Sequence, residues 1–351
     1  MAIRHNKRRC RGLNDQPSCP KALKISIALC TYNGARFLPE QLESLARQSR
    51  LPDELVAVDD RSSDQTVTLL QDFAKNAPFP VRVEVNLENL GVTRNFEKAI
   101  GLCTGDIVAL CDQDDIWKPD KLAQVEHFFN ENPNAALVFS DAEIVDQAGH
   151  PVGYRLWPAA AFGDEQKALV RQGRAFDALA KYNFITGCTM AFRANLREIA
   201  FPTPPDAFAI HDGWIALVTA ALADIGFIEE PLVQYRQHES QQIGVEAPGQ
   251  GDRWGNRLTR RMRDIEHYKR HLRHLERMRE KLLALRADKQ PLRVSEAQID
   301  ALDAQCRHLN ARLNLPGSRL RRLPIVLREI VTGGYARYSS GLRSAAIDLL
   351  G

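Results

Sequence analysis

Three carboxylates stand within four residues of one another in the segment Asp112-Gln113-Asp114-Asp115. The segment ends a run of apolar residues that is typical of a buried strand. Unpaired carboxylates this close repel one another, so a bound cation is the natural compensation. Mg²⁺ or Mn²⁺ suits the pattern, because one or two Asp oxygens commonly hold such an ion while substrate phosphates complete its shell. A solvated acidic turn is the alternative interpretation of Asp-x-Asp taken alone.

A second acidic segment, Asp59-Asp60-Arg61-Ser62-Ser63-Asp64, also follows a strand-like run. Its second half could instead cap the next helix. Two acidic segments that each close an apolar run are harder to explain as ordinary turns than either one alone. Both are therefore candidates for one binding site.

The elements that must position these carboxylates alternate along the chain. The strand-like runs are KISIALC, LVAV, VRVEV and DIVALC, and helical patterns lie between them at residues 37–46, 64–73 and 93–103. This alternation predicts an α/β fold with a mainly parallel open sheet and helices on both faces. Ligands of such sheets bind beyond the carboxyl ends of the strands. The polar clusters TYNG, DDRSSD and DQDD lie at those ends.

The sequence changes from residue 252 onward to amphipathic helices. Apolar residues recur every seven positions in the first helix, and Ser295 with Gln298 forms a candidate capping box for the second. Between residues 253 and 286, twelve Lys or Arg stand against four acids. We expect an antiparallel helical hairpin whose basic face meets either an anionic membrane or protein.

The composition limits the remaining classes. With 351 residues, 44% of them hydrophobic, the chain can bury one sizeable core and add a smaller module. A net charge of +3 is too small to predict nucleic-acid binding. The cysteines are scattered without a Cys-x-x-Cys pair, which predicts neither a zinc knuckle nor a redox site. The first residues lack the apolar h-region of a signal peptide, and no window approaches the ~18 apolar residues of a membrane span. We therefore expect a cytoplasmic location. Peripheral contact with the inner face of the cytoplasmic membrane is left open.

Four segments, in order and in register, resemble the nucleotide-sugar-binding half of family 2 glycosyltransferases with the GT-A fold. They are ISIALCTYNGARFLPEQLESLARQS, VAVDDRSSDQT, NLGVTRNFEKAI and GDIVALCDQDDIWKPDKL. The later HDGW and YRQH segments are similar to a rhamnosyltransferase-like subgroup. Together with the patterns above, the resemblance predicts a flexible tail at 1–22, a GT-A domain at 23–245 and a basic helical region at 252–351. Within the domain, 23–120 would bind the nucleotide sugar and 121–245 the acceptor.

The resemblance also implies roles for single residues. The residues expected around the nucleotide sugar are Thr31, Asn33, Asp59, Asp60, Arg94, Asn95, Asp112 and Gln113. Asp114 is the expected direct metal ligand, with Asp112 and His238 as further ligands. Arg236, on a loop over the diphosphate, would supply a forked donor to the leaving group.

Asp212, in the segment His211-Asp212-Gly213-Trp214, occupies the position of the catalytic base. A carboxylate within about 3 Å of the acceptor hydroxyl can take its proton directly. A helix cap is the alternative role for this residue. Family 2 enzymes invert the anomeric centre, which implies a one-step displacement, and the missing Q-x-x-R-W signature favours a single addition for each acceptor.

The resemblance thus implies a hexosyltransferase (EC 2.4) that uses Mg²⁺ or Mn²⁺ in cell-surface polysaccharide synthesis. Both dTDP-rhamnose and UDP-sugars are open as donors, and a glycan or a lipid-linked molecule as acceptor. A nucleotidyltransferase is one alternative, although TYNGARF lacks the Gly-rich loop with Arg and Lys of that class. A non-catalytic scaffold is the other, and the intact acids argue against it. Donor, acceptor, linkage and oligomeric state depend on surface shape, which these motifs do not set.

Overall fold

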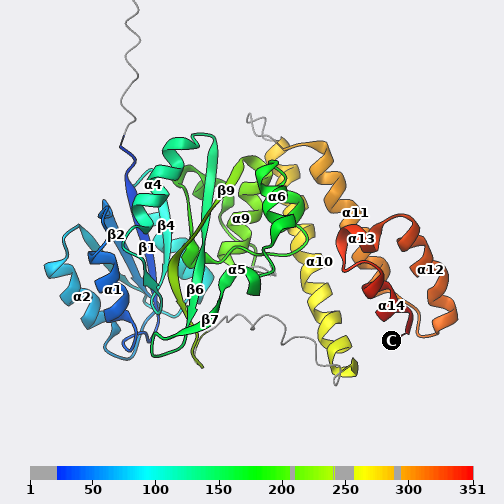
Figure 1. The fold of residues 1–351 in the computed structure, drawn as a ribbon, viewed down its shortest axis with the longest axis horizontal. Helices are drawn as coiled ribbons and strands as arrows, with labels where there is room; N and C mark the ends of the chain where they lie inside the picture. The colour runs from blue at the N-terminus through cyan, green and yellow to red at the C-terminus, as the bar shows by residue number, and fades with distance from the viewer. Residues whose placement is uncertain (1–21, 206–209, 240, 242–256, 288–293, 351) are drawn as a thin grey trace, which may run out of the picture.

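A nine-stranded sheet forms the centre of the molecule in the computed structural model, which describes residues 22–205, 210–239, 241, 257–287 and 294–350. The strand order is β3-β2-β1-β4-β8-β6-β9-β5, with β7 paired to β6 (Figure 1). The strands are β1 (Ile25–Thr31), β2 (Glu54–Asp59), β3 (Val81–Val85), β4 (Ile107–Asp112), β5 (Ile116–Trp117), β6 (Ala135–Val145), β7 (Pro151–Arg155), β8 (Met190–Arg193) and β9 (Asp224–Arg236). Residues 1–21 of the predicted tail and the boundary at 252 lie outside the described residues.

The first four strands of the order, β3 to β4, are parallel to their neighbours. Strands β1, β2 and β4 are almost entirely buried, as expected where helices cover both faces of a parallel sheet. Alternate residues point to opposite faces, so that Ile27 and Leu29 belong to one core cluster while Ala28 and Cys30 belong to the other. The predicted mainly parallel open sheet with helices on both faces is therefore confirmed.

The helices around the sheet divide between its two faces. Apolar residues of α1 (Leu38–Ala46), α2 (Thr66–Asn76) and α4 (Lys121–Glu131) lie in one core cluster, and those of α3 (Val92–Leu102) and α9 (His211–Leu222) lie in the other. The shorter elements are α5 (Leu156–Ala159), α6 (Asp164–Arg171), α7 (Ala175–Leu179), η1 (Gly187–Thr189), η2 (Ala194–Leu196) and α8 (Arg197–Ala200). Each face of the sheet thus has its own core.

The second half of the sheet is mixed in direction. Strand β8 runs antiparallel to both β4 and β6, and β9 runs parallel to β6. The two-residue strand β5 pairs with the end of β9, placing Ile116 opposite Gln234. This pairing brings the segment after Gln234 next to the acidic turn that precedes β5.

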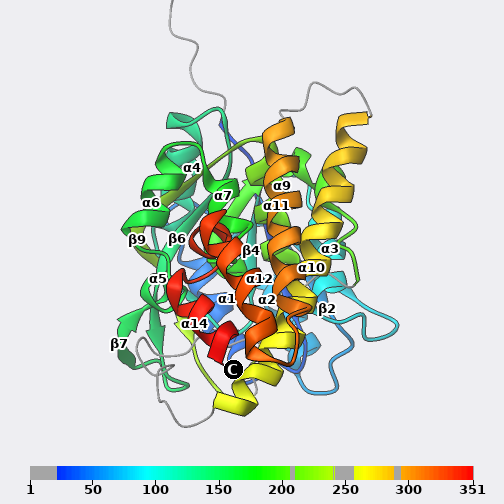
Figure 2. The same ribbon diagram turned by 90° about the vertical axis from the view of Figure 1, so that its right-hand side faces the viewer.

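The C-terminal region is helical and packs on the sheet domain. Helices α10 (Arg257–Ala287) and α11 (Glu296–Leu313) lie side by side and antiparallel (Figures 1 and 2), as predicted. The predicted capping box at the start of α11 is present, with the Ser295 hydroxyl accepting from the Gln298 N–H at 3.2 Å. Leu275 and Leu302 are buried in the same core cluster as Trp214 of α9. The hairpin therefore shares its core with the sheet domain.

Three further helices, α12 (Arg319–Val331), α13 (Gly334–Tyr338) and α14 (Leu342–Leu350), form the end of the molecule farthest from β2 and α2 (Figure 1). They enclose a small core of Val326, Tyr335 and Ala345. Across the described parts of the chain, no helix is both long and apolar enough to cross a membrane.

Candidate active site

The polar clusters that follow β1, β2 and β4 meet at one edge of the sheet. The strand register places Thr31 beside Asp59 and its neighbour Cys30 beside Asp112. Because parallel strands end together, three loops far apart in the sequence converge there. This is the edge at which the sequence predicted a ligand.

Asp59 is held by the protein on both carboxylate oxygens. Its Oδ2 accepts from the Thr31 hydroxyl at 2.8 Å and from the Ser62 hydroxyl at 2.6 Å, and its Oδ1 accepts from the Ser62 N–H at 2.7 Å. The carboxylate is fully buried. These bonds shape the loop after β2, and the predicted nucleotide contacts of Thr31 and Asp59 stay predictions.

Asp60 holds the loop that leads into α3. Its carboxylate accepts from the N–H groups of Leu90 and Gly91 at 2.7 and 2.8 Å and from the Asn86 amide at 2.8 Å. The same Asn86 amide donates to the Asn95 side chain at 2.8 Å. Asp60 and Asn95 are thus brought together through Asn86, which the sequence analysis did not single out.

Gln113 joins the loops after β1 and β4. Its side-chain amide accepts from the Tyr32 N–H at 2.9 Å and donates to the Tyr32 carbonyl at 3.0 Å. A Cβ on Gly34 would lie 1.9 Å from the side-chain Oε1 of Gln113, so any larger residue here would displace this amide. Asn33 adopts a left-handed backbone with φ of 47°, and its side chain accepts from the Ser63 N–H at 2.8 Å.

Two of the predicted nucleotide contacts remain accessible at this edge. Asn33 is exposed at the tip of its loop. Arg94 is exposed in the first turn of α3, where its guanidinium pairs with Glu97. These two side chains can reach a ligand without breaking a buried network.

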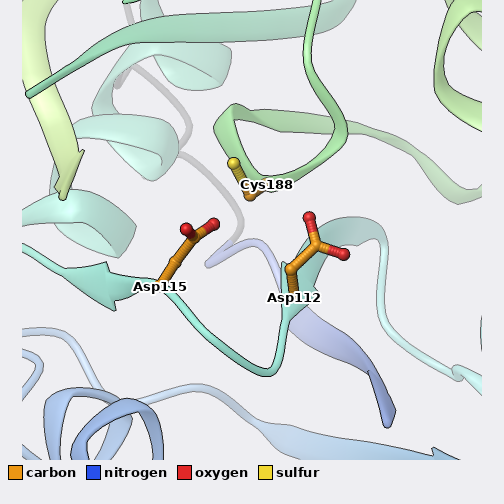
Figure 3. A group of neighbouring side chains, drawn as sticks. All are labelled: Asp112, Asp115 and Cys188. Atoms are coloured by element: carbon orange, nitrogen blue, oxygen red, sulfur yellow. The ribbon is translucent and has the colours of Figure 1, made fainter. Parts of the chain in front are cut away.

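Asp112, Asp115 and Cys188 form a compact group in which one ligand atom of each lies within 4.8 Å of the others. Figure 3 shows both carboxylates pointing toward the loop that carries Cys188. Burial, and next the nearby Asp114, raise the pKa of Asp115 to about 7. Burial, followed by the charge of Asp115, raises the pKa of Asp112 well above its usual range. The Oδ2 atom of Asp115 is buried and has no hydrogen-bond partner within the described chain.

This arrangement fits a bound cation. A buried, unpartnered carboxylate oxygen beside a second carboxylate is costly, and a divalent ion would offset the repulsion. Oxygen ligands of this kind suit Mg²⁺ and Mn²⁺.

Lys121 is a buried cation beside this group that the sequence analysis missed. Its ammonium donates to the Cys188 carbonyl and lies 3.5 Å from the centre of the Trp117 ring. Burial lowers the pKa of Lys121 to about 8. The available signal was the place of this lysine four residues before Val125 in the segment KLAQVEHFF, because that spacing puts both on one side of a helix and a buried lysine needs a partner.

Asp114 and His238 are brought together although they lie 124 residues apart. The His238 Nε2 and the Asp114 Oδ2 are 2.8 Å apart, and the imidazole packs 4.7 Å from the Phe37 ring. A carboxylate and an imidazole in contact are a suitable pair for a divalent transition metal. A cleft of about 390 Å³ adjoins this pair, lined by Asp146, Gln147, Gln237, His238, Glu239 and Gln241.

Arg236 is almost completely buried, and each of its guanidinium nitrogens bonds to the protein. They donate to the Glu40 carboxylate at 2.6 Å, to the Asp114 carbonyl at 2.8 Å and to the Gln147 carbonyl at 3.0 Å. Its backbone N–H also donates to Asp115 at 3.0 Å. Arg236 therefore braces the acidic turn, and its predicted contact with a diphosphate stays a prediction.

Asp212 lies in the first turn of α9. Burial and the charges of Asp115 and Asp114 raise the pKa of Asp112, and the charge of Asp212 adds to them. The carboxylate accepts from the Gly187 N–H at 2.9 Å and from the Gly213 N–H at 2.6 Å. Burial raises the pKa of Asp212 to about 6, which these two bonds oppose. The helix is preceded by Ile210 as its N-cap, so Asp212 is not the capping residue.

His211 is buried beside the proposed base. Its ring stacks on Phe96 at 4.0 Å, and within the described chain neither ring nitrogen has a hydrogen-bond partner. Burial lowers the pKa of His211 to about 3, so the imidazole is neutral at physiological pH.

Comparisons with known proteins agree with this geometry. Residues 26–199 match the family model described as Glycosyl transferase family 2. An uncharacterized glycosyltransferase of Nostoc sp. is 28% identical over 218 residues, which are 62% of this chain and 65% of that protein. The dTDP-rhamnosyl transferase RfbG of Shigella flexneri is 25% identical over 228 residues, which are 62% of this chain and 74% of RfbG.

The crystal structure of S. aureus TarS 1-349 in complex with UDP-GlcNAc shares the fold. It aligns with a TM-score of 0.58 at 16% identity, covering 92% of this chain and 90% of that one. The matched region spans 65% of the Nostoc protein and 59% of a relative from Mycobacterium tuberculosis, which is less than two thirds of either.

Proposed function

Because this chain belongs to glycosyltransferase family 2 and has the GT-A fold, we propose that it transfers a sugar from a metal-bound nucleoside diphosphate sugar to an acceptor hydroxyl, with inversion. The observation that carries the proposal is the convergence of the Asp112–Asp115 turn, His238 and Asp212 at one edge of the sheet. A cation site beside a buried carboxylate of raised pKa is what such a displacement requires.

The donor is proposed from the relatives. TarS has been crystallised with UDP-GlcNAc, and RfbG is named for dTDP-rhamnose. We propose that the donor of this chain is likewise a UDP-sugar or dTDP-rhamnose. Asn33 and Arg94 would contact it directly, and the remaining predicted residues would shape its binding site. A glycan or lipid-linked acceptor in surface polysaccharide synthesis completes the proposal.

Asp114, Asp112 and His238 are the proposed ligands of Mg²⁺ or Mn²⁺. When bound, the ion would stabilise the negative charge that develops on the departing diphosphate. The contact between Asp114 and His238 supports this assignment, and the unpartnered oxygen of Asp115 makes that carboxylate a further candidate ligand. Cys188 offers a sulfur atom, a softer ligand than the carboxylate oxygens. Burial raises the pKa of its thiol, and a protonated thiol of this kind favours a packing role over metal binding.

Asp212 is the proposed base. Its carboxylate takes the proton of the acceptor hydroxyl while the acceptor oxygen bonds to the anomeric carbon. The bond from that carbon to the diphosphate oxygen breaks, and its electron pair leaves with the diphosphate. A pKa of about 6 leaves the group ionised at pH 7 and still basic enough to accept the proton.

The test compares the parent with Asp212→Asn, using Asp224→Asn as a matched control at an exposed position. Each protein is incubated with Mn²⁺, a panel of UDP- and dTDP-sugars and an extract of surface glycolipids, and free nucleoside diphosphate is measured. We expect Asp212→Asn to keep donor-dependent thermal stabilisation and to lose about 10² to 10⁴-fold in turnover. Turnover within a few-fold of the parent would move the base elsewhere, and release of pyrophosphate instead would favour a nucleotidyltransferase.

A further inference from the structure

The outer surface of α12 carries a stripe of apolar side chains. Leu320, Leu323, Leu327 and Val331 recur at intervals of three and four residues, which places them along one side of the helix. All four are exposed, Leu320 by 84% and Val331 by 85%. Exposed apolar residues aligned in this way mark an interaction surface more often than residues scattered singly.

Helix α14 packs against α12 and also carries exposed apolar side chains. Its exposed apolar residues are Leu342, Ile347 and Leu350. The interior of the unit is already filled by Val326, Tyr335 and Ala345. The stripe is therefore not needed to hold these helices together.

The charge on this end is of one sign. From residue 315 to 350 the acids are Glu329 and Asp348. Glu329 is buried and bonded to His308 at 2.7 Å, and Asp348 is bonded to Arg312 at 2.6 Å. The exposed charged side chains are Arg319, Arg321, Arg328, Arg337 and Arg343.

We propose that the exposed face of α12 and α14, defined by the apolar stripe and its flanking arginines, binds anionic phospholipid bilayers peripherally. Apolar side chains can enter the boundary between headgroups and acyl chains while arginines pair with lipid phosphates. An acid-free surface also favours an anionic partner over a second copy of itself, because the like-charged arginines would meet.

Within the basic helical region that the sequence predicted at 252–351, the proposal places the membrane contact on α12 and α14 and not on the basic face of α10. The basic helix α10 turns Leu275, Met278 and Leu282 into the core shared with α9, and its described outer side has few exposed apolar residues. Charge without an apolar stripe gives weaker attachment. The inference does not depend on the sugar chemistry, although a membrane location would suit a lipid-linked acceptor.

The experiment uses the full chain and two kinds of vesicle, phosphatidylcholine alone and phosphatidylcholine with phosphatidylglycerol. We expect the parent to sediment with the anionic vesicles and to be released by salt. The double variant Leu320→Glu/Val331→Glu should bind roughly tenfold more weakly or worse. Leu87→Glu, at a position that is 97% exposed outside this end, is the matched control and should bind as the parent does.

A charge variant separates the two contributions. Arg319→Gln/Arg321→Gln should keep part of the binding and show a shallower salt dependence. Equal binding to neutral vesicles, or equal loss in Leu87→Glu, would overturn the proposal. The proposal would also be overturned if the parent bound no vesicles and sedimentation velocity showed that it is a dimer which the double variant Leu320→Glu/Val331→Glu dissociates. Donor-dependent thermal shift, measured on every variant, keeps this outcome separate from the proposed transfer reaction.

Discussion

Asp112 and Asp115 lie where their ionised forms are opposed by burial and by each other. Lys121 is a buried cation that could act as a counter-ion for these carboxylates. Its ammonium group instead donates to the Cys188 carbonyl and packs on the Trp117 ring. One such lysine does not balance several neighbouring carboxylates. This residual negative charge is the physical reason to expect that the site binds a metal ion.

The raised pKa of Asp212 predicts a pH dependence of transfer. A base must be deprotonated in the free enzyme, so kcat/KM should fall as the pH drops through about 6. Protonation of Asp112, whose pKa burial also raises, should weaken metal-dependent donor binding as the pH falls, so donor binding is measured over the same range and the loss of kcat/KM beyond it is assigned to Asp212. The measurement is kcat/KM from pH 5 to pH 8 at saturating Mn²⁺. A flat profile across this range would contradict the assignment.

The contacts of Arg236 predict an effect on metal binding in the absence of any donor. Arg236→Gln removes the braces to Glu40 and the Asp114 carbonyl, and loss of such supporting contacts typically costs 10–100-fold in metal affinity. Calorimetric titration with Mn²⁺ alone measures it. Asp114→Ala should abolish the same binding, and Arg94→Gln is the control at an exposed arginine. Unchanged Mn²⁺ affinity with weaker donor binding in Arg236→Gln would instead favour the original diphosphate role.

At the scale of elements, the short strand β5 and the long strand β9 decide where the site forms. Their pairing places Arg236 and His238 against the turn between β4 and β5. A two-residue strand has no recognisable pattern in the sequence, since its pairing is set by β9. The TYNG, DDRSSD and DQDD loops could be predicted because each follows an apolar run long enough to identify as a strand.

The hairpin of α10 and α11 should be a cooperative part of the fold. Leu275 is fully buried in the core shared with α9, so Leu275→Ala should lower the free energy of unfolding by about 2–5 kcal/mol. Leu283→Ala, on the same helix but partly exposed, should cost far less. Urea unfolding followed by tryptophan fluorescence and circular dichroism measures both. A separate early transition for the hairpin would show that it folds independently.

At the scale of the whole molecule, two chemistries are separated along the long axis (Figure 1). The sheet edge with its acidic group belongs to the sheet domain, whereas the end formed by α12 to α14 presents arginine and apolar side chains. The modest net charge of +3 conceals this division, because the acids cluster at the sheet domain. A peripheral contact at one end would hold the enzyme at a surface while leaving the sheet edge accessible.

The sequence by itself determined the parallel α/β core, the loops that carry Asp59, Asp112 and Asp114, the helical hairpin and its capping box. These features are local, since hydrophobic periodicity and turn chemistry act over a few residues. Only the tertiary structure decided three further features. All guanidinium nitrogens of Arg236 form hydrogen bonds within the protein, Lys121 is buried beside the acidic group, and the exposed apolar stripe lies on α12 and not on α10. Each of these depends on contacts between distant segments, because burial and partner choice are set by the packing of the whole chain and not by the spacing of residues along it.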